Sequence, residues 1–149
     1  MDSKVFVYVG HSDGKADDSA SELASAARTL FPDSSPTALV AGSGVDGVCE
    51  EAATWLSEVW KFDQEALAYP NAELLRPLLV KVLPAGSILL LAHDTFGLDL
   101  GPGLSVKLGA AYVPDVVGGE ALEEANLKVV RQEFAGQVSA HVHCDVSGG

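Results

Sequence analysis

The sequence predicts an α/β domain with an open, mainly parallel sheet, helices on both faces and a C-terminal antiparallel hairpin. Three observations predict this fold: short apolar runs of strand length, amphipathic segments that alternate with them, and two strand-like runs at the end of the chain. Strands that alternate with helices form parallel sheets whose connections cover both faces. With 149 residues, we expect a single domain, 1–149.

Five apolar runs are the expected parallel strands. They span residues 4–9, 37–41, 65–69, 88–92 and 111–117. The first is apolar and β-branched at nearly every position, which is typical of a strand buried on both faces. Pro114 lacks an amide donor, so we expect the fifth strand to lie at an edge or to break there.

Apolar residues at helical spacing predict the intervening helices. They cover residues 20–31, 45–60, 73–83 and about 100–108. Ser19, with Glu22 three residues later, matches a capping box at the start of the first helix. Residues 10–15 have the composition of a turn. Pro77 is expected either to open the third helix or to kink it.

The end of the chain has a different pattern. Two strand-like runs, 127–134 and 138–144, flank Ala135-Gly136-Gln137. Such spacing predicts a hairpin, which we expect to add to the sheet in antiparallel orientation. His141 and His143 would point the same way from its second strand. A metal centre needs further ligands fixed elsewhere, so no metal site is assigned.

Composition narrows the class of partner. The formal net charge of −12 argues against nucleic-acid phosphate and against anionic membrane surfaces. No apolar run reaches the length of a membrane span, so we expect no membrane insertion. Two reduced cysteines and no recognisable leader or transit peptide favour a cytoplasmic protein, or one of the mitochondrial matrix in a eukaryote.

Ligands of open α/β sheets bind beyond the carboxyl ends of the strands. The fourth expected strand runs into a polar, glycine-bearing loop over residues 94–104. Residues that follow the first and fourth strands are therefore the candidates for cofactor binding. These candidates are Gly10, His11, Asp94, Thr95 and Gly97.

The remaining motifs give weaker evidence for a functional site. Residues 42–47, Gly-Ser-Gly-Val-Asp-Gly, lie between a strand and a helix with glycines at the spacing of a dinucleotide fingerprint, but they follow the second expected strand rather than the first. The carboxylates of Asp46, Glu50 and Glu51 would also repel a phosphate there. A turn that begins a helix is therefore favoured over a phosphate site. Asp94, Asp99 and Asp115 could supply an acid and base, although caps and turn contacts are favoured. No nucleophile elbow occurs, and no catalytic residue is assigned.

Several short motifs occur in an order that resembles one known family. They are Gly42-Ser43-Gly44-Val45-Asp46, Ile88-Leu89-Leu90-Leu91-Ala92, Gly97-x-Asp99-Leu100-x-Pro102, Leu108-Gly109-Ala110 and Asp115-Val116, with Val130-Arg131 and Ala135-Gly136 in the hairpin. The set resembles the N-terminal domain of the electron-transfer flavoprotein alpha subunit, whose fourth strand is followed by a T-x-x-G-[KR]-[DE]-L-x-P-R-like loop. Leu98 and Gly103 depart from it, standing where basic residues are usual.

The resemblance implies a place in a heterodimer with a beta subunit, which passes electrons from dehydrogenases to a quinone-reductase-type or other acceptor. It also implies that FAD belongs to the parent complex, held mostly by a C-terminal FAD-binding domain that is absent from this chain, and that AMP, where the complex holds it, is in the partner subunit. This chain would then be a scaffold, with no catalytic activity of its own.

Two alternatives stay open. The related Rossmann-like fold of universal stress proteins and adenine-nucleotide α-hydrolases would make the chain a stand-alone adenine-nucleotide-binding module. Its candidate rim is the same set of five residues, although no glycine-rich triphosphate loop follows the fourth strand. A small hydrolase using His93, Asp94 and Asp99 is the second alternative.

Overall fold

The computed structural model describes residues 4–123 and 126–149. Its centre is a four-stranded parallel sheet in the order β5-β4-β1-β6. The strands are β1 (Val5–Tyr8), β4 (Thr37–Gly42), β5 (Glu58–Asp63) and β6 (Ile88–Leu90). The expectation about a leader peptide rests partly on residues 1–3, which lie outside the described residues.

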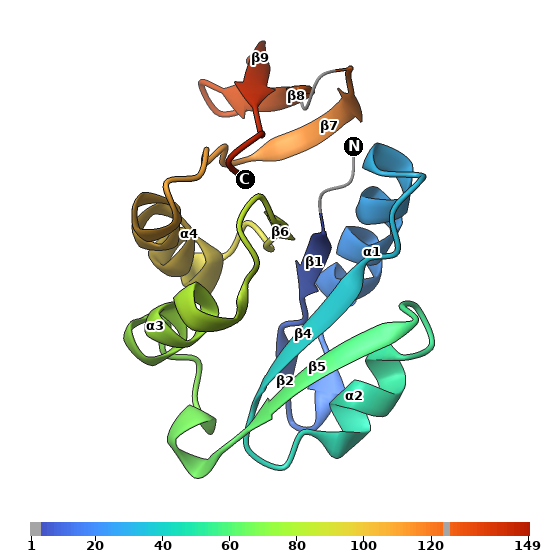
Figure 1. Ribbon diagram of the computed structural model, residues 1–149, viewed down its shortest axis with the longest axis vertical. Helices are drawn as coiled ribbons and strands as arrows, with labels where there is room; N and C mark the ends of the chain where they lie inside the picture. The colour runs from blue at the N-terminus through green and yellow to red at the C-terminus, as the bar shows by residue number, and fades with distance from the viewer. Residues whose placement is uncertain (1–3, 124–125) are drawn as a thin grey trace.

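Helices cover both faces of this sheet (Figure 1). Helices α1 (Asp18–Leu30) and α2 (Asp46–Ala52) pack on one face, where Val5 and Val7 contribute to their core. Helices α3 (Ala72–Val82) and α4 (Thr95–Leu108) pack on the other face against Phe6. The apolar residues of β1 thus alternate between two cores, as a doubly covered strand requires. The predicted fold class is confirmed.

The predicted hairpin is also confirmed, but it does not join the parallel sheet. Strands β8 (Asn126–Glu133) and β9 (Val138–Asp145) pair with β7 (Val116–Ala121) in a separate antiparallel sheet. Figure 1 shows this sheet at one end of the molecule, above α1 and β6. Its inner face reaches the α1-side core through Val129, Cys144 and Val146.

The prediction of a fifth parallel strand over residues 111–117 was wrong. Residues 110–115 have no regular structure, and β7 begins only at Val116. Pro114 has no amide to donate, and Asp115 adopts a left-handed φ of 55°, which turns the chain away from the edge of the parallel sheet.

The second predicted helix, 45–60, was too long. Helix α2 ends at Ala52, whose carbonyl accepts the amides of both Trp55 and Leu56 in a tight turn. The Thr54 hydroxyl also donates to the Glu51 carbonyl at 2.7 Å. The residues beyond form β5, which pairs with β4 along its whole length. The expected strand over 65–69 was wrong too, because a 3-10 turn, η1 (Glu65–Leu67), occupies that segment.

Three local features were predicted only in part. The turn at 10–15 is a small hairpin of β2 (His11–Ser12) and β3 (Lys15–Ala16), whose Asp13 and Gly14 have positive φ angles of 51° and 76°. The N-cap of α1 is Asp17 rather than Ser19, and its side chain makes no capping bond. Pro77 lies inside α3 rather than in its first turn.

The fourth strand is shorter than expected, since β6 ends at Leu90. Helix α4 starts at Thr95, five residues before the predicted position, because the Asp94 side chain caps it. Among the described residues, no helix has the length and apolar character needed to cross a membrane.

Candidate functional site

The crevice expected for ligands lies between β1 and β6, which are neighbours in the sheet. From β1 the chain leads to α1 on one face, and from β6 it leads to α4 on the other. Such a reversal opens a crevice at the carboxyl ends of the two strands. The candidate residues Gly10 and His11 follow β1, and Asp94, Thr95 and Gly97 follow β6. The topology therefore places all five at the same edge.

Asp94 and Gly97 begin helix α4. The Asp94 Oδ1 atom accepts the Gly97 amide at 2.8 Å, which is a capping bond. A Cβ atom at Gly97 would lie 2.1 Å from the Ala92 carbonyl oxygen, so only glycine fits there. Thr95 is the first residue of the helix and is exposed. The capping role favoured for Asp94 is therefore confirmed.

The rim also carries negative charge close to the partly buried phenol of Tyr8. Burial, together with the nearby carboxylates of Asp94 and Asp17, raises the pKa of Tyr8 to about 12. Asp17 lies directly against Gly10, because a Cβ atom there would be 2.6 Å from its Oδ2 atom. Carboxylates from both sides of the crevice thus converge on one place, and they would repel a phosphate group.

His11 points away from Asp94. Its Nε2 atom lies 2.7 Å from the Ala41 carbonyl oxygen at the end of β4. Its ring also packs against Gly42, where a Cβ atom would lie 2.8 Å from the ring carbon Cε1. His11 therefore bridges the β2–β3 hairpin to β4 and does not join the residues after β6.

Asp63 is a rim residue that sequence reasoning missed. Its two carboxylate oxygens accept the amides of Gly44, at 2.9 Å, and Val45, at 3.1 Å. These two backbone bonds hold the pKa of Asp63 below its usual range. The motif at 42–47 is therefore a turn that begins a helix, as predicted, and a carboxylate occupies the place a phosphate would take. The β-branched and aromatic residues Val59, Trp60 and Phe62 could have revealed the strand that positions Asp63.

The residues proposed for hydrolysis, His93, Asp94 and Asp99, each contact a different part of the chain. His93 Nε2 lies 4.0 Å from Asp115 Oδ1, and both side chains are about half exposed. Asp99 is exposed on α4, and its backbone carbonyl accepts a hydrogen bond from the Arg76 side chain.

His141 and His143 share the exposed face of β9. Within residues 4–123 and 126–149, no group of three or more histidine, cysteine or carboxylate side chains is arranged to hold a metal ion.

A large groove runs beside the edge strand β6. Its volume is about 950 Å³, and it is bounded by α1, residues 87–94, α4 and residues 110–119. Leu127, Val129 and Cys144 of the antiparallel sheet, with Val146 and Gly149, also line it. We call this space the β6 groove. Its walls are mainly apolar and include Leu90, Leu104 and Val113. Of the candidate residues, Asp94 and Gly97 line it in the described part of the chain.

A family model described as "Electron transfer flavoprotein domain" matches residues 5–148 of this sequence. The chain belongs to this electron transfer flavoprotein domain family. The match covers both the parallel sheet and the antiparallel sheet of the structure. The family resemblance drawn from the ordered motifs is confirmed.

A curated relative shares this domain. The chain is 26% identical over 134 residues to a protein of Cryptococcus neoformans var. grubii named "Probable electron transfer flavoprotein subunit alpha, mitochondrial". The alignment covers 87% of this chain and 38% of the relative. This electron transfer flavoprotein domain thus spans well under half the length of that protein.

Proposed function

We propose that this chain is the N-terminal scaffold of an electron-transfer flavoprotein alpha subunit. In this role it packs against a beta subunit and supports electron transfer from dehydrogenases to an acceptor, such as a quinone reductase. The flavin, FAD, supplies the redox chemistry and is held mostly by polypeptide outside residues 1–149. AMP, where the complex holds it, belongs to the partner subunit.

One observation carries this proposal: the amides at the ligand edge of the sheet are already used by this chain's own carboxylates. Asp94 takes the Gly97 amide, and Asp63 takes those of Gly44 and Val45. A dinucleotide pyrophosphate needs such free donors at a helix start. The rim residues therefore do not fit the pyrophosphate of FAD, which supports a flavin site elsewhere.

The same contacts count against a stand-alone adenine-nucleotide module. That function would require Gly10, His11 and the loop after β6 to receive a phosphate group. Instead, Asp17 lies against Gly10, and the His11 ring is turned toward the Ala41 carbonyl. The carboxylates of Asp17 and Asp94 would also repel the ligand.

Capture of a beta-type subunit tests the proposal. The purified 149-residue chain is immobilised and offered an electron-transfer flavoprotein beta subunit from the same genome. An unrelated protein of similar negative charge serves as the control bait, because an acidic surface alone retains basic proteins. We expect stoichiometric capture by the chain and none by the control. Equal retention on both baits, or on neither, would contradict the scaffold role.

Calorimetric titration with AMP tests the alternative. We expect no saturable heat when AMP is added to the isolated chain. Binding with a dissociation constant of about 1 μM would instead favour the nucleotide-binding module.

A further inference from the structure

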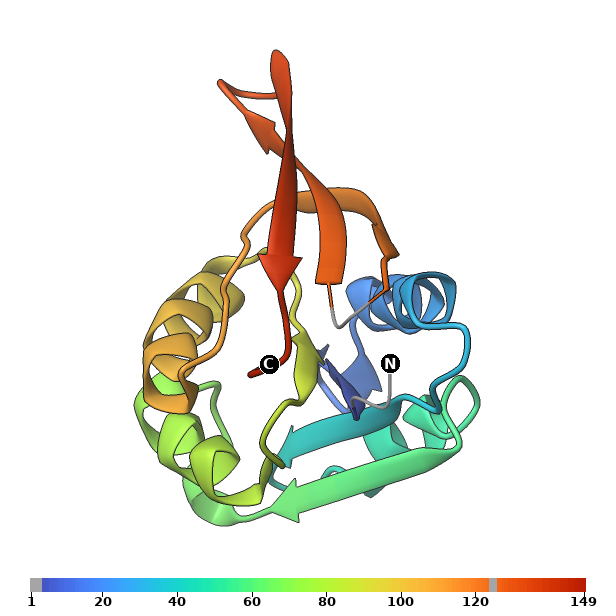
Figure 2. The same cartoon turned by 45° about the horizontal axis from the view of Figure 1, so that its top comes forward.

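Helices α3 and α4 form an outer face of the molecule, which we call the α3–α4 face. Figure 1 and Figure 2 show the two helices side by side, with no other described element outside them. The face exposes four large apolar side chains, Leu74, Val80, Leu98 and Val106. Apolar side chains that gather on one face of a soluble domain mark an interaction site.

The charge of this face differs from that of the whole chain. The chain has 21 acidic and 9 basic residues, so two copies repel one another through most of their surface. Helices α3 and α4 carry basic residues at Arg76, Lys81 and Lys107, against the acidic Glu73 and Asp99. Like charge therefore does not keep a second copy away from the α3–α4 face.

In helix α3 the outward residues are symmetric about the exposed Pro77. Glu73 and Lys81 lie four residues to either side of this proline. Leu74 and Val80 lie three residues to either side. An antiparallel copy of α3, centred on Pro77, would thus place an acid opposite a base and an apolar residue opposite an apolar one.

Helix α4 repeats this symmetry about the exposed Pro102. Leu98 and Val106 lie four residues to either side of Pro102. Asp99 and Lys107 are symmetric about the next residue of the helix, and both are exposed. An antiparallel copy of α4 would therefore also meet itself with matched charges and matched apolar residues.

The two centres of symmetry lie at about the same level of the molecule. The Arg76 side chain lies against Gly103, since a Cβ atom there would be 2.6 Å from its Nε atom. It also donates to the Asp99 carbonyl at 3.1 Å. Arg76 and Gly103 directly adjoin the two central prolines. Both helices return from the carboxyl edge of the sheet to its amino edge, so one two-fold axis would reverse both at once.

Acidic first turns and basic last turns also suit the helix dipole, so the charges alone do not indicate a partner. The dipole does not account for exposed apolar residues at symmetric positions. We infer that the α3–α4 face binds a second copy of this chain about a two-fold axis, with each helix antiparallel to its counterpart. Asp99 then faces Lys107 of the second copy, and Leu98 faces its Val106. Such an interface is isologous, because the same patch serves on both copies.

Light scattering over a concentration series tests the inference on the purified chain. We expect the molar mass to rise from that of one chain to that of two. Val106→Asp should raise the dissociation constant about tenfold or more, because it buries a carboxylate that has no partner. Val106 is 79% exposed within one chain, so its replacement leaves the fold intact.

Val117→Asp is the matched control, because Val117 is 58% exposed on β7, outside the α3–α4 face. We expect it to leave the dissociation constant within about twofold of the parent. The mass of one chain at every concentration up to about 1 mM would overturn the inference. Equal weakening by both substitutions would overturn it too, since the contact would then not lie on this face.

Crosslinking with a short bismaleimide tests the symmetry. Pro102→Cys places a thiol near the two-fold axis, where it meets the same thiol of the second copy. Thr95→Cys places it seven residues away on the same face, so that two such thiols lie about 20 Å apart. The parent, with its own Cys49 and Cys144, gives the background.

We expect a crosslinked dimer for Pro102→Cys and only background for Thr95→Cys. Crosslinking at Thr95 equal to that at Pro102, or none above background at either, would overturn the antiparallel arrangement. Neither measurement involves a beta subunit, so the homodimer and the scaffold role can fail separately.

Discussion

At the residue scale, Gly97 lies at the tightest backbone approach in α4. A Cβ atom there would meet the Ala92 carbonyl oxygen at 2.1 Å, and this backbone group cannot swing aside as the end of a flexible side chain could. We expect Gly97→Ala to lower the free energy of unfolding by about 2 kcal/mol, since overpacking forces the backbone to shift. Urea denaturation of the two proteins measures the difference.

Gly103, in the same helix, is the matched control. A Cβ atom there would meet the end of the Arg76 side chain at 2.6 Å, which is flexible and can move away. Alanine also favours a helix over glycine, so Gly103→Ala should stay within about 1 kcal/mol of the parent. A loss at Gly97 no larger than that at Gly103 would contradict the packing account.

Asp63 should make stability depend on pH. Its folded-state pKa is lowered by the amides of Gly44 and Val45, so its contribution is present above the unfolded pKa of about 4. That contribution is lost as pH falls through the folded value. We therefore expect Asp63→Asn to destabilise the chain at neutral pH, and the difference from the parent to shrink below about pH 4.

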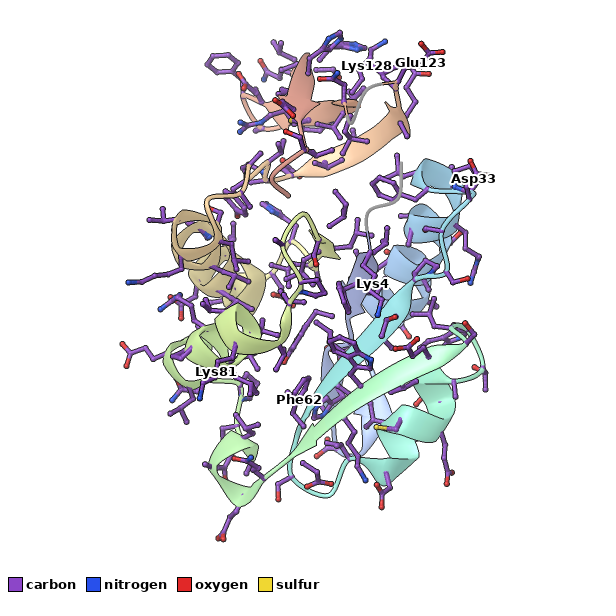
Figure 3. All side chains as sticks on the ribbon, in the orientation of Figure 1. Lys4, Asp33, Phe62, Lys81, Glu123 and Lys128 are labelled. Atoms are coloured by element: carbon purple, nitrogen blue, oxygen red, sulfur yellow. The ribbon has the colours of Figure 1, made fainter. Side chains whose placement is uncertain are left out.

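Chemical denaturation from neutral to acidic pH measures this difference. Asp33→Asn removes the same charge from the loop after α1, where Figure 3 labels it, and is the control. A gap between the parent and the Asp63 variant that persists unchanged into acid would show that the carboxylate is not the group responsible.

At the scale of elements, a helix or strand could be predicted where its apolar period and its flanking turn residues agreed. Where they were ambiguous, the prediction failed. The strand at β1, the helices α1 and α3, and the β8–β9 hairpin were predicted, because period and turn residues agreed. The prediction of one helix over residues 45–60 failed because apolar residues at helical spacing continue through a helix, a turn and an edge strand. Only the pairing of β5 with β4, a tertiary contact, decides between those readings.

The N-termini of two helices give a test at this scale. Asn71 caps α3, since its Oδ1 atom accepts the amides of Glu73 at 3.0 Å and Leu74 at 3.3 Å. We expect Asn71→Ala to cost about 1 kcal/mol in thermal or urea unfolding. Ser19→Ala should cost almost nothing, because Ser19 lies inside α1. If Ser19→Ala lost more stability than Asn71→Ala, Ser19 would be a helix cap after all, contrary to the structure.

At the scale of the whole molecule, the antiparallel sheet is tied to the parallel sheet by a small apolar contact. Val129 is 3% exposed and packs in the core beneath α1, whereas His141 lies on the outer face of β9. We expect Val129→Ala to cost about 2 kcal/mol and His141→Ala little, because only the first leaves a cavity. Calorimetric unfolding compares them, and equal losses would contradict the packing of the two sheets against one another.

The site, too, could be predicted only in part. The sequence placed Gly10, His11, Asp94, Thr95 and Gly97 at one edge, because their strands were recognised. It could not reveal which donors at that edge are already taken, since the bond from Gly44 to Asp63 joins residues 19 apart that fold together only through β5. Because that long-range bond occupies the Gly44 amide, it favours a scaffold role over nucleotide binding.

Calorimetric titration of the isolated 149-residue chain with FAD tests the central claim most directly. Because Asp63 and Asp94 hold the amides that a pyrophosphate would need, we predict no saturable binding and no change in the flavin spectrum. Binding of one FAD per chain with a dissociation constant of about 1 μM or below would contradict the claim that the flavin is held elsewhere.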